Sequence, residues 1–115
     1  MNNNKFNKNE GKILDNTFKK YNLGNEIMKA LEGIGYSKPS DVQSKVIPEI
    51  LTGKDVVVKS QTGSGKTAAF GIPLCERILW DESKPQALIL TPTRELAIQV
   101  SKEIKKLSKY MHGIK

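Results

Sequence analysis

The stretch Asp55-Val56-Val57-Val58-Lys59, followed at once by Ser60-Gln61-Thr62-Gly63-Ser64-Gly65-Lys66-Thr67, decides the fold of this 115-residue chain. Its short β-branched run predicts a strand buried on both faces. The Gly/Ser/Thr turn that follows leads into a helix predicted from about Gly65 to Leu79. A strand, a glycine-rich turn and a helix in this order bring free backbone N–H groups together at a helix start, where anions bind.

Residues 60–67 therefore predict a phosphate-binding loop, or P-loop. Gly63 and Gly65 permit backbone conformations that point successive N–H groups at a polyphosphate. Lys66 can reach the terminal phosphates, and the Thr67 hydroxyl is placed to bind Mg²⁺. The strict pattern begins with glycine, where this sequence has Ser60. The alternative is a Gly/Ser turn that binds nothing.

The rest of the chain predicts an α/β fold. Helices are predicted over about Asn25–Leu31 and from Pro39 to Gly53, and a second buried strand over Gln86–Thr91. A last helix carries an apolar stripe between Leu96 and Leu107. Alternating strands and helices predict a parallel sheet with right-handed crossovers. Two strands are too few for such a sheet, so we expect the front part of a larger domain with an incomplete sheet.

Composition narrows the function classes. Hydrophobic residues make up 37% of the chain, as in a globular protein, and no apolar run is long enough to span a membrane, so we expect a cytoplasmic protein. The single cysteine, Cys75, excludes an internal disulfide. The net charge of +7 resides at the two ends, because positive and negative side chains balance over residues 21–100. Basic ends are compatible with an anionic partner or with solubility alone.

A second candidate segment is Gly35-Tyr36-Ser37-Lys38-Pro39-Ser40-Asp41-Val42-Gln43, which Phe18 precedes. The Gln43 amide could hydrogen-bond both N6 and N7 of an adenine, and Phe18 could stack on the base. The alternatives are an ordinary glutamine on a helix surface and a phenylalanine that anchors the N-terminal segment.

A third candidate segment, Pro92-Thr93-Arg94-Glu95-Leu96-Ala97, follows the second predicted strand. Ligands of open parallel sheets bind at that edge. Thr93 and Arg94 at a helix start are natural donors to phosphate. The alternative is a helix N-cap with a glutamate in the first turn.

Together these segments resemble the DEAD-box RNA helicase family. Residues 60–67 are similar to its motif I, residues 35–43 with Phe18 to its Q motif, and residues 92–97 to its motif Ia. Residues 57–76 and 80–100 are most similar to its DbpA-like bacterial branch. The resemblance implies a P-loop NTPase of the RecA-like three-layer type. Residues 1–15 would be a disordered lead-in, 16–44 the Q-motif region, and 45–115 the front part of the ATP-binding domain.

The resemblance also implies roles for individual residues. Lys66 would hold the β- and γ-phosphates of ATP, and Thr67 would bind Mg²⁺; both would belong to the catalytic machinery. Gln43 would read adenine, with Phe18 packed on the base. The rest of the phosphate cradle would be Ser60, Gln61, Thr62, Gly63, Ser64 and Gly65. The RNA sugar-phosphate backbone would be contacted by Pro92, Thr93 and Arg94.

The implied function is ATP-dependent remodelling of structured RNA, with ribosomal RNA as the expected substrate, by a monomer without membrane contact. The sequence contains no Asp-Glu-Ala-Asp and no Ser-Ala-Thr stretch. Carboxylates that position magnesium and water are worth orders of magnitude in phosphoryl transfer, so we expect this chain alone to bind ATP or ADP rather than to hydrolyse ATP. The alternatives are a non-catalytic nucleotide- or RNA-binding fragment and another P-loop NTPase.

Overall fold

The computed structural model describes residues 17–60, 65–79 and 83–111. Its elements are a short 3-10 helix, η1 (Phe18–Tyr21), followed by α1 (Asn25–Ile34), α2 (Asp41–Leu51), α3 (Lys66–Arg77) and α4 (Arg94–Leu107). The four α-helices lie where hydrophobic periodicity and capping residues predict them. The lead-in predicted for residues 1–15 lies outside the described residues.

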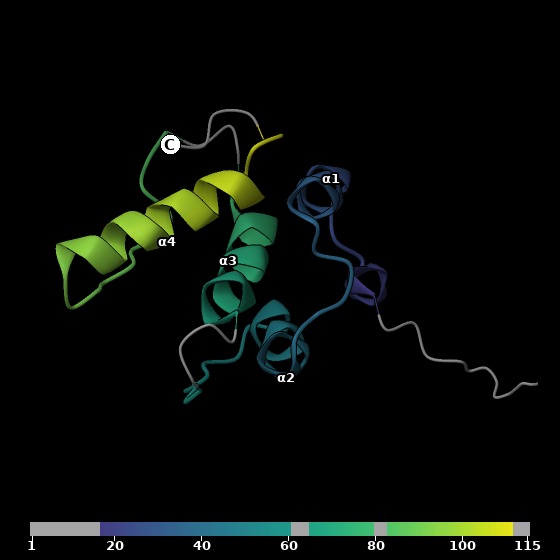
Figure 1. The fold of residues 1–115 in the computed structure, drawn as a ribbon, viewed down its shortest axis with the longest axis horizontal. Helices are drawn as coiled ribbons and strands as arrows, with labels where there is room; N and C mark the ends of the chain where they lie inside the picture. Colours follow the sequence, from purple (N-terminus) through teal and green to yellow (C-terminus); the bar gives the residue numbers. More distant parts are fainter. Residues whose placement is uncertain (1–16, 61–64, 80–82, 112–115) are drawn as a thin grey trace, which may run out of the picture.

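Helix α3 holds the described part together. It packs against α2 on one side and α4 on the other, and α1 contacts both α3 and α4 (Figure 1). The buried core draws on every element, because each helix turns its apolar stripe toward α3. The core consists of Phe18, Leu23, Ile27, Leu31, Ile47, Ala68, Ile72, Cys75 and Leu107.

Specific local signals end α1 and begin α2. Gly35 stops α1 in the left-handed conformation (φ 92°), and the Tyr36 N–H donates to the carbonyl of Leu31 at 2.9 Å. Glycine suits this position because it has no Cβ to clash there. Ser40 caps α2 in a capping box, in which its hydroxyl accepts from the Gln43 N–H and the Gln43 side chain accepts from the Ser40 N–H.

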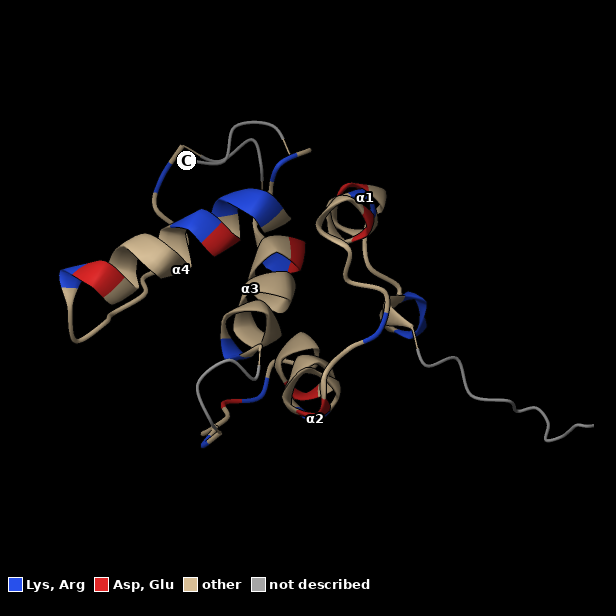
Figure 2. Cartoon of the chain, in the orientation of Figure 1, with Lys and Arg blue, Asp and Glu red and all other residues tan. Residues whose placement is uncertain are grey.

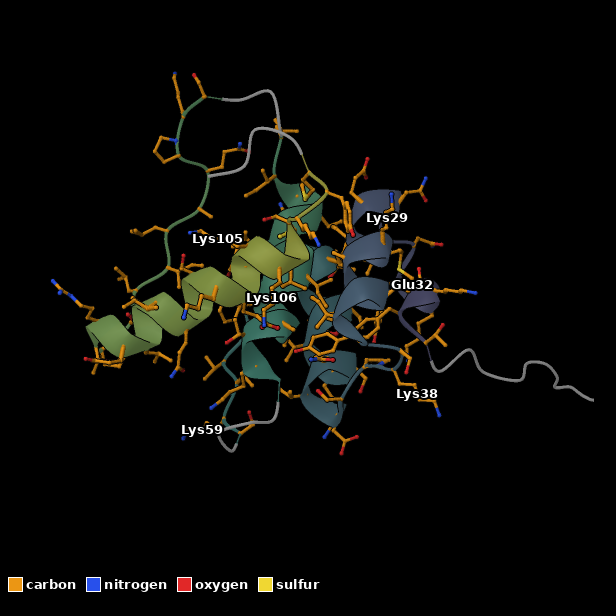
Figure 3. All side chains as sticks on the ribbon, turned by 45° about the horizontal axis from the view of Figure 1, so that its top comes forward. Lys29, Glu32, Lys38, Lys59, Lys105 and Lys106 are labelled. Atoms are coloured by element: carbon orange, nitrogen blue, oxygen red, sulfur yellow. The ribbon has the colours of Figure 1, made fainter. Side chains whose placement is uncertain are left out.

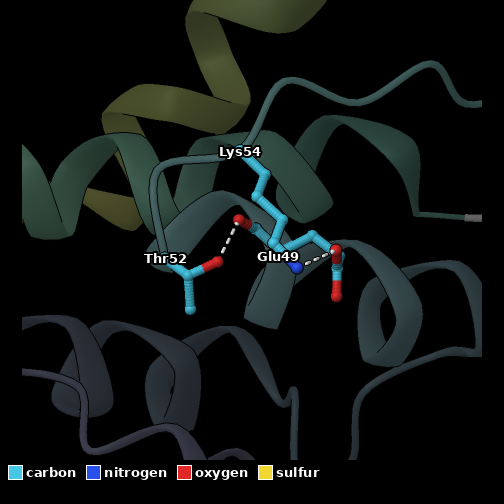
Figure 4. Close-up of polar contacts among 3 residues, drawn as sticks. All are labelled: Glu49, Thr52 and Lys54. Atoms are coloured by element: carbon cyan, nitrogen blue, oxygen red, sulfur yellow. Dashed lines mark hydrogen bonds and ion pairs between the residues drawn. The ribbon is translucent and has the colours of Figure 1, made fainter.

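The C-terminal end of α2 turns the chain toward the phosphate-loop segment. The Thr52 hydroxyl donates to the Glu49 carbonyl at 2.8 Å, and the Lys54 ammonium lies 3.3 Å from the Glu49 carboxylate (Figure 4). Gly53 makes the turn between them with φ 89°. Both charged side chains are about half exposed or more, so this ion pair contributes little stability. The backbone turn at Gly53 sets the direction in which the chain leaves α2.

Helices α3 and α4 approach closely at Gly71. A Cβ at this position would lie 2.8 Å from Cδ1 of Leu107 and 2.9 Å from Cδ1 of Ile104. Leu107 is completely buried. The absence of a side chain at Gly71 therefore lets α4 seat its apolar stripe on α3.

The two predicted strands are not formed in the described part of the chain. Residues 55–59 and 86–91 carry no strand, and their apolar side chains face solvent, with Val57 92% and Leu88 82% exposed. A parallel strand needs hydrogen-bonding neighbours at its edges and helices on both faces. These two segments lack both, so they show the apolar composition of buried strands without the pairing.

None of the helices in the described residues has the length and apolar character needed to cross a membrane.

Candidate phosphate-binding site

The phosphate-loop prediction centres on the start of α3. Gly65 is the N-cap residue of α3, with φ 89° and ψ 23°, and it carries no side chain that could cap the helix. This left-handed conformation strains any residue with a Cβ. The first turn of α3 therefore directs backbone N–H groups and the positive end of the helix dipole toward the loop. That arrangement suits an anion.

Lys66 places its charge on the loop side of α3. Its ammonium group donates to the carbonyl of Ser60 at 2.7 Å, across the base of the loop. Thr67, the next residue of α3, is half-buried. The predicted cradle residues Gln61, Thr62, Gly63 and Ser64 lie outside the described residues. The described ends of the loop thus bring a cation and a helix N-terminus together.

Gln43 joins α2 to this loop. Its side chain is only 5% exposed, so the alternative of an ordinary surface glutamine is wrong. Its Oε1 accepts from the Ser40 N–H at 2.9 Å, and its Nε2 donates to the Gly65 carbonyl at 3.2 Å. An amide has two acceptor and two donor positions, so one of each remains for an adenine.

Phe18 is a core residue. Its ring is 1% exposed and packs tilted against the ring of Tyr21, with centroids 6.3 Å apart. The anchoring alternative therefore describes its position here. Phe18 also lines an open pocket of about 690 Å³ between η1, α1 and residues 35–37, a volume typical of small-molecule sites. Gln43 and Gly65 do not line this pocket. Stacking of Phe18 on a base remains a prediction.

Thr93 begins α4. Its hydroxyl accepts from the Leu96 N–H at 3.1 Å, so the N-cap alternative is confirmed, and its own O–H hydrogen remains for a donor role. Pro92, Thr93 and Arg94 are all exposed. Their predicted contact with RNA stays a prediction, and an exposed helix start with an adjacent arginine suits a phosphate.

The basic charge predicted near the C-terminus gathers on α4. Basic residues colour its C-terminal half in Figure 2, and Lys105 and Lys106 are labelled on it in Figure 3. These lysines and Lys102 are exposed. Their place in the last turns also suits the negative end of the helix dipole, so the helix itself accounts for part of the pattern.

Two contacts near the candidate site escaped the sequence reasoning. Ser40 lies beside the loop, because a Cβ on Gly65 would be 3.2 Å from its hydroxyl. The Ser-x-x-Gln spacing of Ser40 and Gln43 is a capping-box signal that could have identified it. The Tyr36 hydroxyl donates to the Glu103 carboxylate at 2.9 Å. No local pattern predicts that contact, because its partners lie 67 positions apart.

The described residues fit a nucleotide phosphate. The left-handed glycine, the helix start without a side-chain cap and the Lys66 ammonium are the groups that bind such an anion. For Mg²⁺ the described residues offer the Thr67 hydroxyl, and they hold no cluster of three or more His, Cys, Asp or Glu side chains. Magnesium commonly takes its remaining ligands from phosphates and water.

Comparison with known proteins finds related sequences. Residues 40–115 match the DEAD/DEAH box helicase family. The chain is 62% identical over 93 residues to the ATP-dependent RNA helicase DbpA of Bacillus subtilis (strain 168), which confirms the expected resemblance to the DbpA-like branch. The match covers 81% of this chain and 19% of that protein. The chain thus spans about a fifth of the length of this relative.

Solved structures show the same likeness. A DEAD box protein from Methanococcus jannaschii matches with a TM-score of 0.75 at 48% identity, over 79% of this chain and 25% of that one. Dbp5 of S. cerevisiae bound to RNA and ADP BeF3 matches with a TM-score of 0.80 at 31% identity, over 84% and 25% of the two chains. The helices described above are therefore arranged as in part of these proteins.

Proposed function

Because this chain belongs to the DEAD/DEAH box helicase family, we propose that it is the nucleotide-binding front part of an ATP-dependent RNA helicase. The observation that carries the proposal is the start of α3, where Gly65, Lys66 and the buried amide of Gln43 meet. The helix dipole and the ammonium favour a polyphosphate, and the amide retains a donor and an acceptor for a base.

In this proposal each predicted residue has one task. Lys66 neutralises charge on the terminal phosphates of ATP, and the loop residues 60–65 direct their N–H groups at them. Thr67 supplies a hydroxyl ligand to Mg²⁺, whose chemistry is to neutralise phosphate charge during transfer. Gln43 selects adenine, and Phe18 packs beside the base. Contacts to the RNA backbone come from Pro92, Thr93 and Arg94, and such contacts bind RNA without sequence preference.

The proposed complete domain has the RecA-like three-layer architecture. Its parallel sheet would include residues 55–59 and 86–91, and their exposed apolar side chains support this (Val57 92%, Leu90 84%). Hydrolysis is assigned to the whole helicase, since an Asp-Glu-Ala-Asp stretch does not occur in this sequence. The proposed substrate is structured RNA, ribosomal RNA in particular, acted on by a cytoplasmic monomer.

A nucleotide- or RNA-binding chain without catalysis is the second candidate. It is favoured by the sequence, which contains no Asp-Glu-Ala-Asp stretch to position magnesium and water. Family membership sets aside an unrelated P-loop NTPase such as a small-molecule kinase. Sequencing the coding region beyond codon 115 distinguishes the two candidates: a reading frame that continues into an Asp-Glu-Ala-Asp stretch favours the helicase, and a frame that does not favours the chain without catalysis.

Nucleotide binding itself is tested by amide NMR titration with Mg-ADP and Mg-GDP. We expect resonances of residues 65–69 to shift with Mg-ADP and to shift far less with Mg-GDP. Lys66→Ala should abolish the shifts, whereas Lys59→Ala, which removes an exposed lysine just before the loop (Figure 3), should leave them unchanged. Equal shifts in the two variants would overturn the assignment of Lys66.

Adenine selection requires a variant that preserves the fold. Gln43→Glu keeps an acceptor for the Ser40 N–H and hence the capping box. It removes the donor that adenine N7 requires and also the donor to the Gly65 carbonyl, so the affinities for Mg-ADP and Mg-GDP are compared within the same variant. We expect this variant to lose its preference for Mg-ADP over Mg-GDP while its helical content stays unchanged. A retained preference would assign adenine recognition to other residues.

A further inference from the structure

A hydrogen bond joins the candidate adenine-reading segment to the helix that begins with the candidate RNA contacts. Tyr36 follows the glycine that ends α1, and its hydroxyl donates to Oε2 of Glu103 on α4 at 2.9 Å. Both residues are half-buried. Burial, and then the hydrogen bond and negative charge of Glu103, raise the pKa of Tyr36 above its ordinary value of 10.0. The hydroxyl therefore remains a donor at neutral pH.

This bond lies between the two candidate binding segments. Residues 35–43 run from Tyr36 to the capping box, where Gln43 contacts the Gly65 carbonyl. On the other side, Glu103 belongs to the same continuous helix as Arg94. At a rise of about 1.5 Å per residue, Glu103 and Arg94 lie about 14 Å apart along this helix. Tyr36 and Glu103 therefore connect residues 35–43 to the helix that begins at Arg94.

Glu103 is well suited to this contact. It is flanked by lysines on α4, including Lys102 and Lys106, yet its carboxylate bonds the tyrosine across the helix interface. A hydrogen bond to a charged acceptor is stronger than a neutral one. Phenylalanine at position 36 would keep the ring packing and lose only this bond.

We propose that Tyr36 and Glu103 are positioning residues that couple nucleotide binding at residues 43 and 65–67 to the RNA-contacting start of α4 at residues 92–94. The inference rests on the proposed function, because it assumes that a nucleotide binds at Gly65 and Lys66. The bond biases where α4 lies when residues 35–43 respond to the bound base.

The test follows amide NMR shifts during titration of the 115-residue chain with Mg-ADP. In the wild type we expect shifts at residues 65–69 and, at a distance, at residues 93–96. Tyr36→Phe should keep the shifts at 65–69 and lose most of those at 93–96. Glu103→Gln retains an oxygen acceptor and should preserve most of the distant response, whereas Glu103→Ala should lose it as Tyr36→Phe does.

Tyr21→Phe is the matched control. The Tyr21 hydroxyl is buried without a hydrogen-bond partner in the structure, so its removal should leave both sets of shifts unchanged. Far-ultraviolet circular dichroism verifies that every variant retains its helices.

The outcomes separate the two claims. If Mg-ADP shifts no resonance at residues 65–69 of the wild type, the proposed function and this inference both fail. If those resonances shift but residues 93–96 do not respond, or respond equally in Tyr36→Phe, only the inference is overturned. An equal response in Tyr36→Phe would point instead to the α3–α4 contact at Gly71.

Discussion

The side-chain nitrogen of Gln43 and the carbonyl oxygen of Gly65 are 3.2 Å apart, and a Cβ on Gly65 would lie 2.5 Å from that nitrogen. The start of α3 is therefore shaped from outside the loop, by a residue of α2. The two segments that sequence patterns assign to phosphate and to adenine are therefore in direct contact at these two residues. Substitutions in α2 should consequently affect the phosphate site.

Gly65→Ala should damage both stability and nucleotide binding. Alanine is strained at φ 89°, and its Cβ would displace the Gln43 amide, so we expect a loss of about 1–3 kcal/mol in the free energy of unfolding. Urea denaturation monitored by circular dichroism measures it. Gly33→Ala is the control, because nothing lies within 4 Å of a Cβ there; it should stabilise α1 by up to about 1 kcal/mol. Equal effects of the two substitutions would contradict the prediction.

Ser40→Ala should weaken the N-terminus of α2. It removes the acceptor for the Gln43 N–H, at 3.3 Å, and N-cap losses of this kind cost about 0.5–2 kcal/mol. Ser44→Ala removes a hydroxyl that bonds the Asp41 carbonyl within the helix and should change stability by less than about 0.5 kcal/mol. Thermal unfolding of the two variants under the same conditions measures this difference in stability. A Ser44→Ala variant as unstable as Ser40→Ala would argue against the capping box.

Leu107→Ala and Leu90→Ala should differ in their loss of stability, although both replace leucine with alanine. Leu107 is 0% exposed and Leu90 is 84% exposed. Truncating the buried side chain leaves a cavity between α3 and α4 and should cost about 2–5 kcal/mol. The exposed truncation should cost less than about 0.5 kcal/mol. Denaturant midpoints provide the comparison, and a large loss at Leu90 would show that residues 86–90 are covered in solution.

Cys75 should make the chain sensitive to alkaline pH. Burial raises the pKa of its thiol from 9.0 to about 11, so the unfolded state releases its proton first. The resulting stability is fully present below about pH 9 and is lost as pH rises toward about 11. Urea unfolding at several pH values should show this fall, reaching up to about 2 kcal/mol.

Cys75→Ala is the control for that pH dependence. Its stability should be flat until the tyrosines titrate, because burial also raises the pKa of Tyr21 and, with Glu103, that of Tyr36 above 10.0. If wild type and variant lose stability in parallel between pH 9 and about 11, the thiol is not the cause. Below pH 9 the native thiol should also react with alkylating reagents much more slowly than the unfolded one.

Local patterns predicted the helices well, because their signals are local. The Gly35 terminator, the Ser40 cap and the apolar spacing of α4 each act within a few residues. The two predicted strands are not formed in the described residues. Residues 55–59 and 86–91 have the composition of buried strands, but strand formation depends on partners distant in sequence, and the described chain does not supply them.

The candidate site divides in the same way. The prediction of a phosphate-binding loop rests on residues 60–67 alone, because the residue types and their order carry the signal. The burial of Gln43 could not be predicted from the sequence, because it depends on how α2 packs on α3. For Phe18 the sequence left base stacking and anchoring of the N-terminal segment open, and packing places the ring in the core at 1% exposure.

By itself the sequence determined the helices and the resemblance to DEAD-box helicases, and it predicted phosphate binding by residues 60–67. Each of these depends on residue identity at short spacing, and short-range backbone geometry follows from identity. Only the tertiary structure decided that Gln43 touches Gly65, that Phe18 is buried and that Tyr36 meets Glu103. Such contacts join residues far apart in the chain, and the packing of one helix on another, rather than any local preference, brings them together.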